Sequence, residues 1–569
     1  MKVLTKAVRT TLFEAEDSVC LQRARLLTEV YNLHENDPPP IRQARYFAHI
    51  LAGMDLDLSS NPIFAGNTSS RPRAMMLNPE YGFSVDKQTE LENPGLASVM
   101  EEGVPDDLRE FWADRSLGKG SSASIGHLAV DLHTVVHEGL ESVIQAARHA
   151  GTDGGDAQSN YRAGMVIALQ AVCDWSLRYS KKAALMAENE GDALRRDLYL
   201  RISDACRNVP GKPARNLFEG LQAIALVHLA TVIEGQGVSV SIGLPDRVLA
   251  PFIDSALAAE EVVDLVSGFL LKIAANSFQG RGSKTQAITV GGADSAGIDQ
   301  CNALTLAFLD ACAAVRVGDP HLFLRWHPGI DPTVEQRASE LLSEGLSMPL
   351  LISDTATAGG LINAGIHPEH AWEYCVIGCN ELGIPGRLSE SAYPAGGSIQ
   401  YLSALNDTIG DPDCPASMEG VLQGMSTRMA EALESDRESG RVQKQLLATR
   451  LPTPFTSALM HGCVATGTDL LLGMEYHCAG VYERGFTNAV NGLAAINELC
   501  FEKSSMTLSE LSTHIDEDFA DIAALQSIVA CPKWGTGDDS TDALAERLLR
   551  AREAALGVVY GPDSPVLPV

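Results

Sequence analysis

From residue 236 onward, short β-type runs alternate with helical runs, and this alternation constrains the fold more than any other feature. Apolar and β-branched residues make up the short runs, and the longer runs carry apolar residues at helical spacing. The β-type runs cover 238–242, 287–290, 322–326, 350–352 and 374–377, and the longer runs cover 258–274, 297–315 and 333–346, with a turn at 368–373. Alternating strands and helices predict an α/β architecture with a buried sheet or barrel.

The sequence on either side of this region shows mainly helical periodicity. Helices are expected over 9–33, 41–55, 130–149, 159–189 and 213–234, and again over 396–449 and 486–502. The three prolines at 38–40 predict an extended link between the first two helices. Arg71 and Arg73 are expected to tie the N-terminal helices to the rest. The chain therefore divides into a mainly helical part, 1–235, and a part that forms the sheet or barrel, 236–569.

Acidic residues outnumber basic ones, 73 to 43, which gives a formal net charge of -30. Such a surface repels nucleic acid and anionic membranes, so neither is expected as a partner. No apolar run is expected to approach the ~18 residues of a membrane span, and the N-terminus shows no signal-peptide pattern. Twelve cysteines without the spacing of a disulfide framework indicate a reducing compartment. The protein is therefore predicted to be cytoplasmic.

One β-type run leads into a cysteine that is followed two residues later by an acid. The stretch 374–386 reads Tyr-Cys-Val-Ile-Gly-Cys-Asn-Glu-Leu-Gly-Ile-Pro-Gly. Gly378 and Gly383 allow backbone turns that other residues resist, so Cys379 is expected to project from a loop with Glu381 on the same side. The arrangement suits a reactive thiol beside a carboxylate. Taken alone, it also fits an ordinary buried thiol near a surface acid.

A series of ordered segments between residues 41 and 540 carries a family resemblance. They are 70–73 and 79–81 (Ser-Arg-Pro-Arg, Pro-Glu-Tyr), 206–222, 241–246 (Ser-Ile-Gly-Leu-Pro-Asp), 289–294, 348–354, 378–381 (Gly-Cys-Asn-Glu), 488–496 and 532–539 (Pro-Lys-Trp-Gly-Thr-Gly-Asp-Asp). In this order they resemble the glycyl radical enzymes, the superfamily of pyruvate formate-lyase, as one domain. The Gly-Cys-x-Glu form is similar to the eliminating branch, which includes diol, choline, isethionate and hydroxyproline lyases.

The resemblance implies a fold and a reaction. The fold would be a ten-stranded α/β barrel, complete or incomplete, that is built from two half-barrels, is surrounded by helices and follows a largely helical N-terminal third. Cys379 would lie on a loop inside the barrel, and its thiyl radical would take a hydrogen atom from a small polar metabolite. Glu381 would act as general base on a substrate hydroxyl while a neighbouring group leaves. A rigid loop in a dry cavity suits this chemistry.

The resemblance also implies binding residues and partners. Substrate contacts are expected from His127, Asp246, Asp294 and Glu390, although capping or structural roles fit the first three as well. No metal site and no cofactor bound by this chain is expected. The glycyl radical of the family is installed by an iron–sulfur activase that uses S-adenosylmethionine, and the protein is expected to form a homo- or hetero-oligomer.

Two departures from the family pattern bear on function. The chain has no run of the Arg-Val-x-Gly-Tyr type, since Gly557 and Gly561 lie in Leu-Gly-Val-Val-Tyr-Gly-Pro. Three explanations stay open: a separate small subunit that bears the radical glycine, a degenerate scaffold or binding protein, or a thiol enzyme that uses Cys379 as nucleophile. The His-Asp pair that diol-dehydrating relatives carry beyond the loop is also absent, and Leu382 stands where the family has Pro.

Other metal-friendly residues are interpreted as structural. Cys375 and Cys379 have the spacing of the first two cysteines of a radical S-adenosylmethionine cluster, but Leu382 occupies the third position. His477 and Cys478 are adjacent, and such a pair more often packs than binds a metal. The sequence therefore predicts no metal site.

Overall fold

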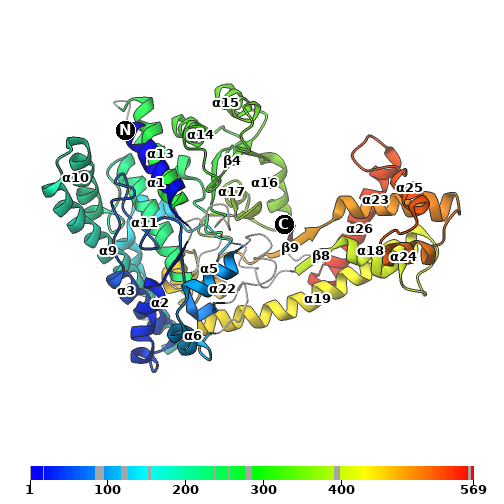
Figure 1. Cartoon of the computed structure of the whole chain (residues 1–569), viewed down its shortest axis with the longest axis horizontal. Coiled ribbons are helices and arrows are strands. Elements are labelled where there is room, and N and C mark those ends of the chain that lie inside the picture. Colours follow the sequence, from blue (N-terminus) through cyan, green and yellow to red (C-terminus); the bar gives the residue numbers. More distant parts are fainter. Residues whose placement is uncertain are drawn as a thin grey trace. The chain divides into compact units, whose positions relative to one another are not determined.

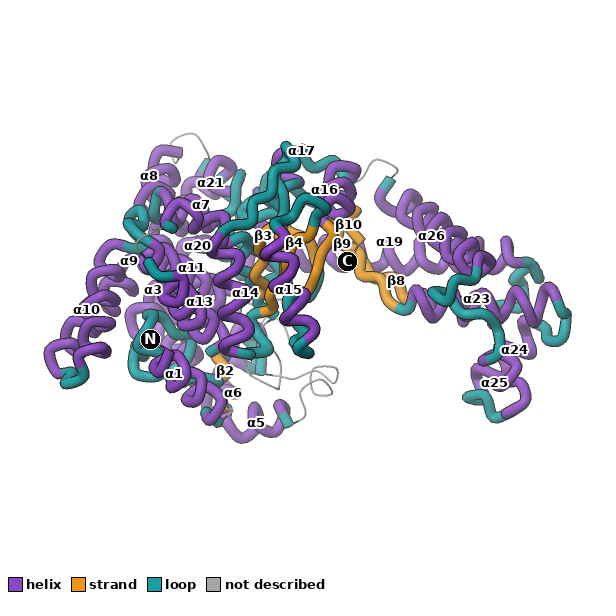
Figure 2. The backbone as a smooth tube through the Cα atoms, turned by 90° about the horizontal axis from the view of Figure 1, so that it is seen from above, coloured by secondary structure: helices purple, strands orange, loops and turns teal. Residues whose placement is uncertain are grey.

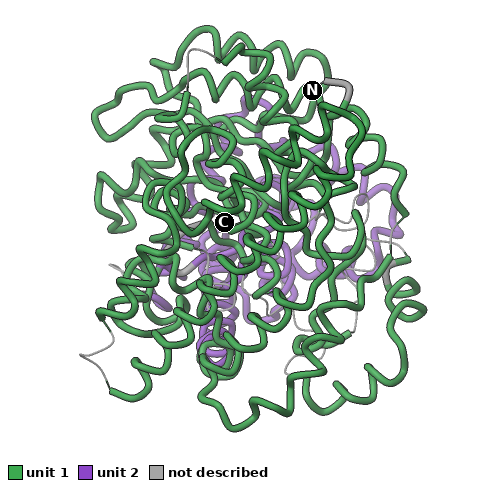
Figure 3. The backbone as a smooth tube through the Cα atoms, turned by 90° about the vertical axis from the view of Figure 1, so that its left-hand side faces the viewer, with its two compact units in different colours: residues 1–391, 445–477 green, residues 392–444, 478–569 purple. Residues whose placement is uncertain are grey.

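The computed structural model describes residues 2–16, 18–83, 95–116, 126–150, 155–235, 239–253, 257–275, 285–389, 397–561 and 566–568. It contains two compact units (Figure 3), and each is described by itself. Unit 1 comprises Met1–Ser391 and Gln445–His477, and unit 2 comprises Ala392–Lys444 and Cys478–Val569. The predicted division at residue 235 marks where strands begin to alternate with helices, and as a statement about domains it stays a prediction.

Helices make up most of unit 1 (Figure 1). The first group is α1 (Lys2–Glu14), α2 (Gln22–Val30), η1 (Tyr31–His34), α3 (Pro39–Gly53), η2 (Pro79–Tyr81), α5 (Leu96–Gly103), α6 (Asp106–Trp112), α7 (Leu132–His137), α8 (Leu140–His149), α9 (Asp156–Asn189), α10 (Ala193–Asn208) and α11 (Leu217–Gly235). The second group is α12 (Pro245–Leu249), η4 (Ala250–Phe252), α13 (Ala259–Ala274), α14 (Ala303–Val315), α15 (Pro332–Ser343), α16 (Asp354–Asn363), α17 (Pro368–Ala371), α20 (Pro454–Ala458), α21 (Cys463–Thr466) and α22 (Leu470–Gly473).

Helix α11 lies in the centre of the main core, against α7, α9, α13 and α20. Every residue of α11 except Glu234 is buried, and a helix that is apolar on all sides needs such a position. Among the described residues, α11 is the one helix that is long and apolar enough to cross a membrane. The expectation that no run approaches this length is therefore wrong. In the folded protein, 94% of the apolar 18-residue stretch of α11 is buried.

The prolines near residue 40 are not an extended link. Pro39 and Pro40 form the first turn of α3, and only Pro38 has an extended ψ of 138°. Proline suits this position because the first N–H groups of a helix have no intrahelical partner. The predicted helix over 130–149 is also divided, into α7 and α8. Gly139 separates them with φ +80°, and a Cβ there would overlap the Gly211 carbonyl oxygen.

Unit 1 contains a parallel three-stranded sheet in the order β3 (Ala287–Gly291), β4 (His321–Trp326), β5 (Leu350–Ser353). Helices α14 and α15 lie beside its strands (Figure 2). Two smaller pairs are β1 (Ser18–Cys20) with β2 (Ala74–Met76), which is parallel, and β6 (Cys375–Ile377) with β7 (Glu381–Gly383), which is an antiparallel hairpin. The predicted strands at 287–290, 322–326, 350–352 and 374–377 are confirmed, and so is the α/β class.

Unit 2 has a parallel sheet in the order β10 (Val566–Pro568), β9 (Ala479–Arg484), β8 (Gly397–Gln400). Its helices are α18 (Tyr401–Ile409), the first part of α19 (Met418–Arg450), α23 (Phe486–Ile496) with the π-helical η5 (Asn497–Glu502), α24 (Leu508–Asp516), α25 (Ile522–Val529) and α26 (Asp539–Tyr560). They bury an apolar core of their own. The described strands thus form four separate sheets, and a closed ten-stranded barrel stays a prediction.

A fully buried ion pair joins the sheet of unit 1 to the strand that leads into the cysteine loop. Arg325 in β4 donates from Nε to Asp354 Oδ1 at 2.6 Å, and both side chains are 0% exposed. The same guanidinium donates to the carbonyl oxygens of Ala293 at 3.1 Å and Tyr374 at 3.2 Å. It also lies 4.1 Å from the centroid of the Tyr374 ring. Residue 374 is thereby fixed at the carboxyl edge of the sheet.

Replacing Asp354 by Asn tests the importance of this pair. The substitution leaves the Arg325 cation buried without its counter-charge, a change that costs about 3–5 kcal/mol in comparable cases. We expect a clear fall in the melting temperature of the protein, measured by circular dichroism. The matched control is Glu344→Gln, which removes the exposed Arg316–Glu344 pair at 3.4 Å and should cost at most about 1 kcal/mol. Equal shifts in both variants would contradict the expectation.

Candidate active site

The predicted thiol lies at the turn of the β6–β7 hairpin. Ile377 pairs with Glu381 across the hairpin, so Gly378, Cys379 and Asn380 form the turn. Gly378 has φ +63°, a conformation that residues with a Cβ rarely adopt. The hairpin is tied to the sheet of unit 1, because Val376 N–H donates to Thr289 Oγ1 at 2.9 Å. The loop is therefore an ordered hairpin rather than a loose connection.

Glu381 is buried beneath this turn, with 4% of its surface exposed. Its Oε2 accepts the backbone N–H of Cys379 at 2.7 Å and that of Asn380 at 3.0 Å. Its other oxygen, Oε1, lies 3.7 Å from His127 Nε2. The carboxylate is thus oriented by the backbone of the cysteine turn, and Oε1 faces the histidine.

His127 reaches the site from the segment before α7. Its backbone has φ +49°, which is uncommon for a residue with a side chain. Burial lowers the pKa of His127 below its ordinary value of 6.5, although the nearby Glu381 acts in the opposite direction. A neutral imidazole at pH 7 can donate one hydrogen bond and accept another. The chain thereby brings a carboxylate and a neutral histidine together next to the cysteine turn.

Gly378 fits closely between these two side chains. A Cβ at residue 378 would lie 2.6 Å from Glu381 Oε2 and 2.6 Å from His127 Cδ2. Both distances are shorter than atoms tolerate, so the side chains or the turn would have to move. Glycine is therefore required here by its neighbours as well as by its φ.

Cys379 itself is exposed. All twelve cysteines lie within the described residues. Cys379 is the only one of them that is exposed, and the others are buried or partly buried. Cys375, four residues earlier, is fully buried, and burial raises its pKa to about 12. The described residues therefore present an accessible thiol and do not enclose it, although the sequence led us to expect a position inside a barrel.

The other predicted binding residues lie elsewhere or have structural partners. Asp246 is fully buried, and it accepts hydrogen bonds from the backbone N–H of Gly291 at 2.8 Å and from Thr305 Oγ1 at 2.7 Å. Asp294 accepts the N–H groups of Ala296 and Ile298, both at 2.9 Å, within its own loop. Glu390 lies outside the described residues. The recorded contacts join neither Asp246 nor Asp294 to the cysteine turn.

Two further groups near the hairpin were missed by the sequence analysis. Ser241 Oγ accepts the N–H of Gly378 at 3.2 Å and that of Ala287 at 3.1 Å, so it links the turn to β3. Its only sequence signal was its place at the start of the 241–246 segment. The second group is an ion pair between His461 Nε2 and Asp131 Oδ2 at 2.9 Å, beside Gly386. No local pattern joins residues so distant in the chain.

The ion pair changes the acidity of its carboxyl group. Burial alone would raise the pKa of Asp131, but hydrogen bonds from His461 and Thr134 outweigh burial and lower the pKa to about 2. Within the described residues, no group of three or more His, Cys, Asp or Glu side chains could hold a metal ion. The site therefore offers a thiol, a carboxylate and neutral or paired histidines.

Comparison with known proteins shows the family to which this chain belongs. Residues 2–556 match the model of the pyruvate formate lyase-like family, so the chain belongs to that family. The resemblance stated from the ordered segments is therefore confirmed.

Individual relatives agree with this assignment. The chain is 25% identical to the probable dehydratase YbiW of Escherichia coli, over 93% of this chain and 75% of the relative. It is 24% identical to (2S)-3-sulfopropanediol dehydratase of Klebsiella oxytoca, over 94% and 74% of the two chains. A glycyl radical enzyme structure from Archaeoglobus fulgidus aligns with TM-score 0.82 and 21% identity, over 100% of this chain and 80% of that one. The predicted enzyme class, a lyase of this superfamily, agrees with these names.

Gly378→Ala tests the close packing at the cysteine turn. The new Cβ would clash with Glu381 and His127, and the positive φ would add about 1–2 kcal/mol of strain. We expect the melting temperature to fall and the rate of Cys379 alkylation by iodoacetamide to change. Gly345→Ala is the matched control, because Gly345 has φ +82° but no atom lies within 4 Å of the place where its Cβ would stand. If both variants behave alike, the contacts of Gly378 do not matter.

The lowered pKa of His127 predicts a pH dependence of stability. Between the folded pKa and 6.5, the unfolded chain binds more protons than the folded chain, so stability should fall as the pH falls through this window. His127→Gln removes this part of the proton uptake and should reduce the fall in melting temperature between pH 7 and pH 5. The buried His228, whose pKa is lowered to about 4 by burial, keeps its own contribution. The control is His49→Gln, a surface position on α3. A His127→Gln profile that follows the wild type would contradict the expectation.

Proposed function

We propose that this chain is the catalytic subunit of a glycyl-radical-type lyase or dehydratase that acts on a small polar metabolite. Cys379 provides the thiol that becomes the thiyl radical, Glu381 is the general base, and His127 contacts the substrate. The observation that carries this proposal is the orientation of Glu381 by the backbone of the cysteine turn. The dehydratase names of the two relatives support it.

In the proposed reaction, two side chains share the chemical steps. The Cys379 radical takes a hydrogen atom from a substrate carbon, which forms S–H and leaves a carbon radical. Glu381 takes the proton of the hydroxyl on that carbon, and the neighbouring group leaves with its bonding electrons. The product radical then takes back the hydrogen atom from Cys379. General base catalysis by a positioned carboxylate contributes about 10²–10⁴ in rate.

The radical in this proposal comes from outside the 569 residues, which contain no Arg-Val-x-Gly-Tyr run. A small subunit that bears the radical glycine supplies the unpaired electron, and an iron–sulfur activase that uses S-adenosylmethionine installs it. The exposure of Cys379 supports this part of the proposal, because an accessible thiol leaves room for a partner segment to reach the sulfur and to exclude water. Asp246, Asp294 and Glu390 would contact substrate only if the assembled site brings them near.

The exposed thiol also fits two other candidate functions. A degenerate relative that acts as a scaffold or binding protein has no need to enclose Cys379, and neither has an enzyme that uses this cysteine as a nucleophile. The two candidates and the radical enzyme differ in one readout: only the radical enzyme forms a glycine-centred doublet in electron paramagnetic resonance. A cytoplasmic location for each of them stays a prediction.

Activity after co-expression with a glycine-bearing subunit and an activase tests the proposal. The compounds to be tested as substrates are small vicinal diols and hydroxyl-bearing sulfonates and amines. Products are measured by mass spectrometry under anaerobic conditions. Cys379→Ala should abolish turnover, and Glu381→Gln should lower kcat by about 10²–10⁴. Cys375→Ala, at the buried cysteine four residues earlier, is the matched control and should retain turnover. Full turnover in Cys379→Ala would end every catalytic version of the proposal.

A further inference from the structure

Unit 1 has a cleft that is lined by several positively charged side chains, although the protein is acidic. None of the residues described at the cysteine turn lines this cleft. Its volume is about 310 Å³, and its lining includes Tyr31, Arg42, Tyr46, Trp112, Arg115 and Arg450. These residues come from η1, α3, α6 and the turn that follows it, and the last residue of α19. Separate segments thus bring three guanidinium groups to one cleft, although the chain carries a formal charge of -30.

The three arginines have little competing charge. Within the described residues, none of Arg42, Arg115 and Arg450 forms an ion pair with a carboxylate. Arg42 donates to the backbone oxygen of Glu35 at 3.3 Å, and Arg115 donates to that of Phe111. Two carboxylates, Glu35 and Glu80, also line the cleft. Glu80 is paired with Arg23, so Glu35 is the carboxylate that stands against the three guanidinium groups. Guanidinium groups without carboxylate partners in one cleft are suited to carboxylate, sulfonate or phosphate oxygens.

Aromatic rings form the wall beside these charges. The ring centroids of Tyr31 and Trp112 lie 5.0 Å apart in an edge arrangement, and those of Tyr31 and Tyr46 lie 5.9 Å apart and stacked. The rings are held in place, since Tyr46 Oη donates to the Tyr31 carbonyl oxygen at 2.7 Å and Trp112 Nε1 donates to Thr28 Oγ1 at 2.9 Å. A fixed aromatic wall binds a flat apolar group with little loss of entropy.

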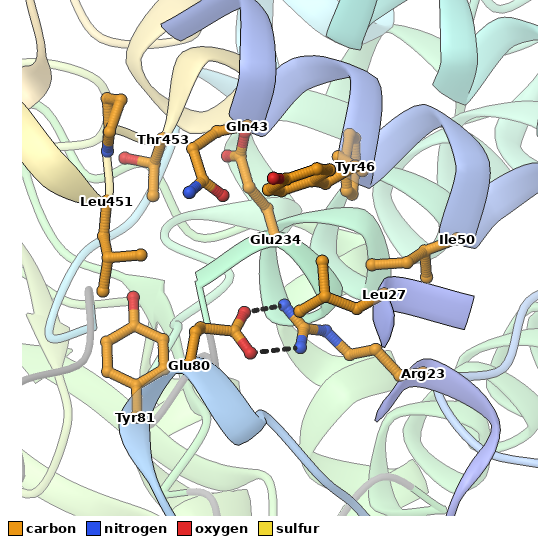
Figure 4. A pocket seen from close by; sticks show the side chains of 12 residues that line it. Arg23, Leu27, Gln43, Tyr46, Ile50, Glu80, Tyr81, Glu234, Leu451 and Thr453 are labelled. Carbon is orange, nitrogen blue, oxygen red and sulfur yellow. Dashed lines mark hydrogen bonds and ion pairs between the residues drawn. The ribbon is translucent and has the colours of Figure 1, made fainter. Parts of the chain in front are cut away.

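The floor of the cleft holds one arginine and two carboxyl groups, and each of them has partners of its own. It continues into a deeper cavity of about 20 Å³, with which it shares Leu27, Gln43, Tyr46, Glu80 and Leu451 (Figure 4). There Arg23 forms a two-pronged pair with Glu80, whose Oε2 accepts from Nη1 at 2.9 Å. Arg23 also donates from Nε to the Ile233 carbonyl oxygen at 3.0 Å. Arg23 and Glu80 neutralise each other. The other carboxyl group of this cavity, Glu234, accepts hydrogen bonds from the N–H groups of Phe455 and Thr456, and burial raises its pKa to about 7. The positive charge without a partner therefore lies with the three outer arginines.

We infer that this cleft is a second ligand site, separate from the cysteine turn, that binds a small anion with a flat apolar body. The arginines bind the anionic group, and Tyr31, Tyr46 and Trp112 contact the flat body. The size lies at the lower end of small-molecule pockets, which cover roughly 300–1,000 Å³. Aromatic carboxylates and aromatic phosphate esters share this chemistry.

Fluorescence titration with 1-anilinonaphthalene-8-sulfonate tests the site on the full chain and needs no radical activation. We expect saturable binding at one site per chain and quenching of tryptophan emission, with the uncharged N-phenyl-1-naphthylamine binding more weakly. Arg42→Ala, Arg115→Ala and Arg450→Ala should each weaken binding about two- to fivefold, as the loss of one partly exposed charged contact does. Arg207→Ala, at an exposed arginine on α10, is the matched control and should leave binding unchanged.

Competition identifies the anionic group. Displacement of the probe by benzoate or by phenyl phosphate, but not by benzyl alcohol, supports the site and shows which anion it prefers. Melting temperatures confirm that each variant is folded, and Arg42→Lys repeats the test with the positive charge retained. Unchanged affinity in all three arginine variants, or equal affinity for the charged and uncharged probes, would overturn the inference.

Discussion

The buried pair of Arg325 and Asp354 holds together the part of unit 1 on which the cysteine hairpin depends. Arg325 comes from the central strand of the sheet, and Asp354 begins α16 directly after β5. The guanidinium also donates to the carbonyl oxygen of Tyr374, the residue before β6. Charges removed from water are stable only when partners satisfy them on every side. The sheet edge therefore sets where the hairpin starts, and Ser241 and Thr289 set where its turn lies.

The hairpin places a carboxylate and a thiol in different environments. Glu381 is buried and receives backbone donors, whereas the Cys379 side chain is exposed at the turn. In the proposed reaction, the general base needs a fixed orientation, and the thiol must be reachable by a partner and a substrate. The observed packing suits this division, because it is close at Gly378, between the carboxylate and His127.

The sequence anticipated the strands and the cysteine turn well, since their signals are local. β3, β4, β5 and β6 follow apolar runs bounded by turn residues, and the spacing of Cys379 and Glu381 made a loop plausible. Other features depended on distant partners. The role of Pro39 and Pro40 was misjudged because helix entry and extended chain share the same φ. Helix α10 was missed, because half of its residues are polar or charged and it depends on packing against α9.

The sequence alone determined the family, the α/β class and the closeness of thiol and acid. The family and the class follow from short local runs in a fixed order along the chain, and Cys379 and Glu381 are only two residues apart. The tertiary structure decided that His127 lies next to Glu381 and that Asp246 accepts hydrogen bonds from Gly291 and Thr305. It also decided that three arginines line one cleft. These contacts depend on how helices and strands pack, and the packing is determined by many weak interactions between residues far apart in the sequence. No local pattern contains that information.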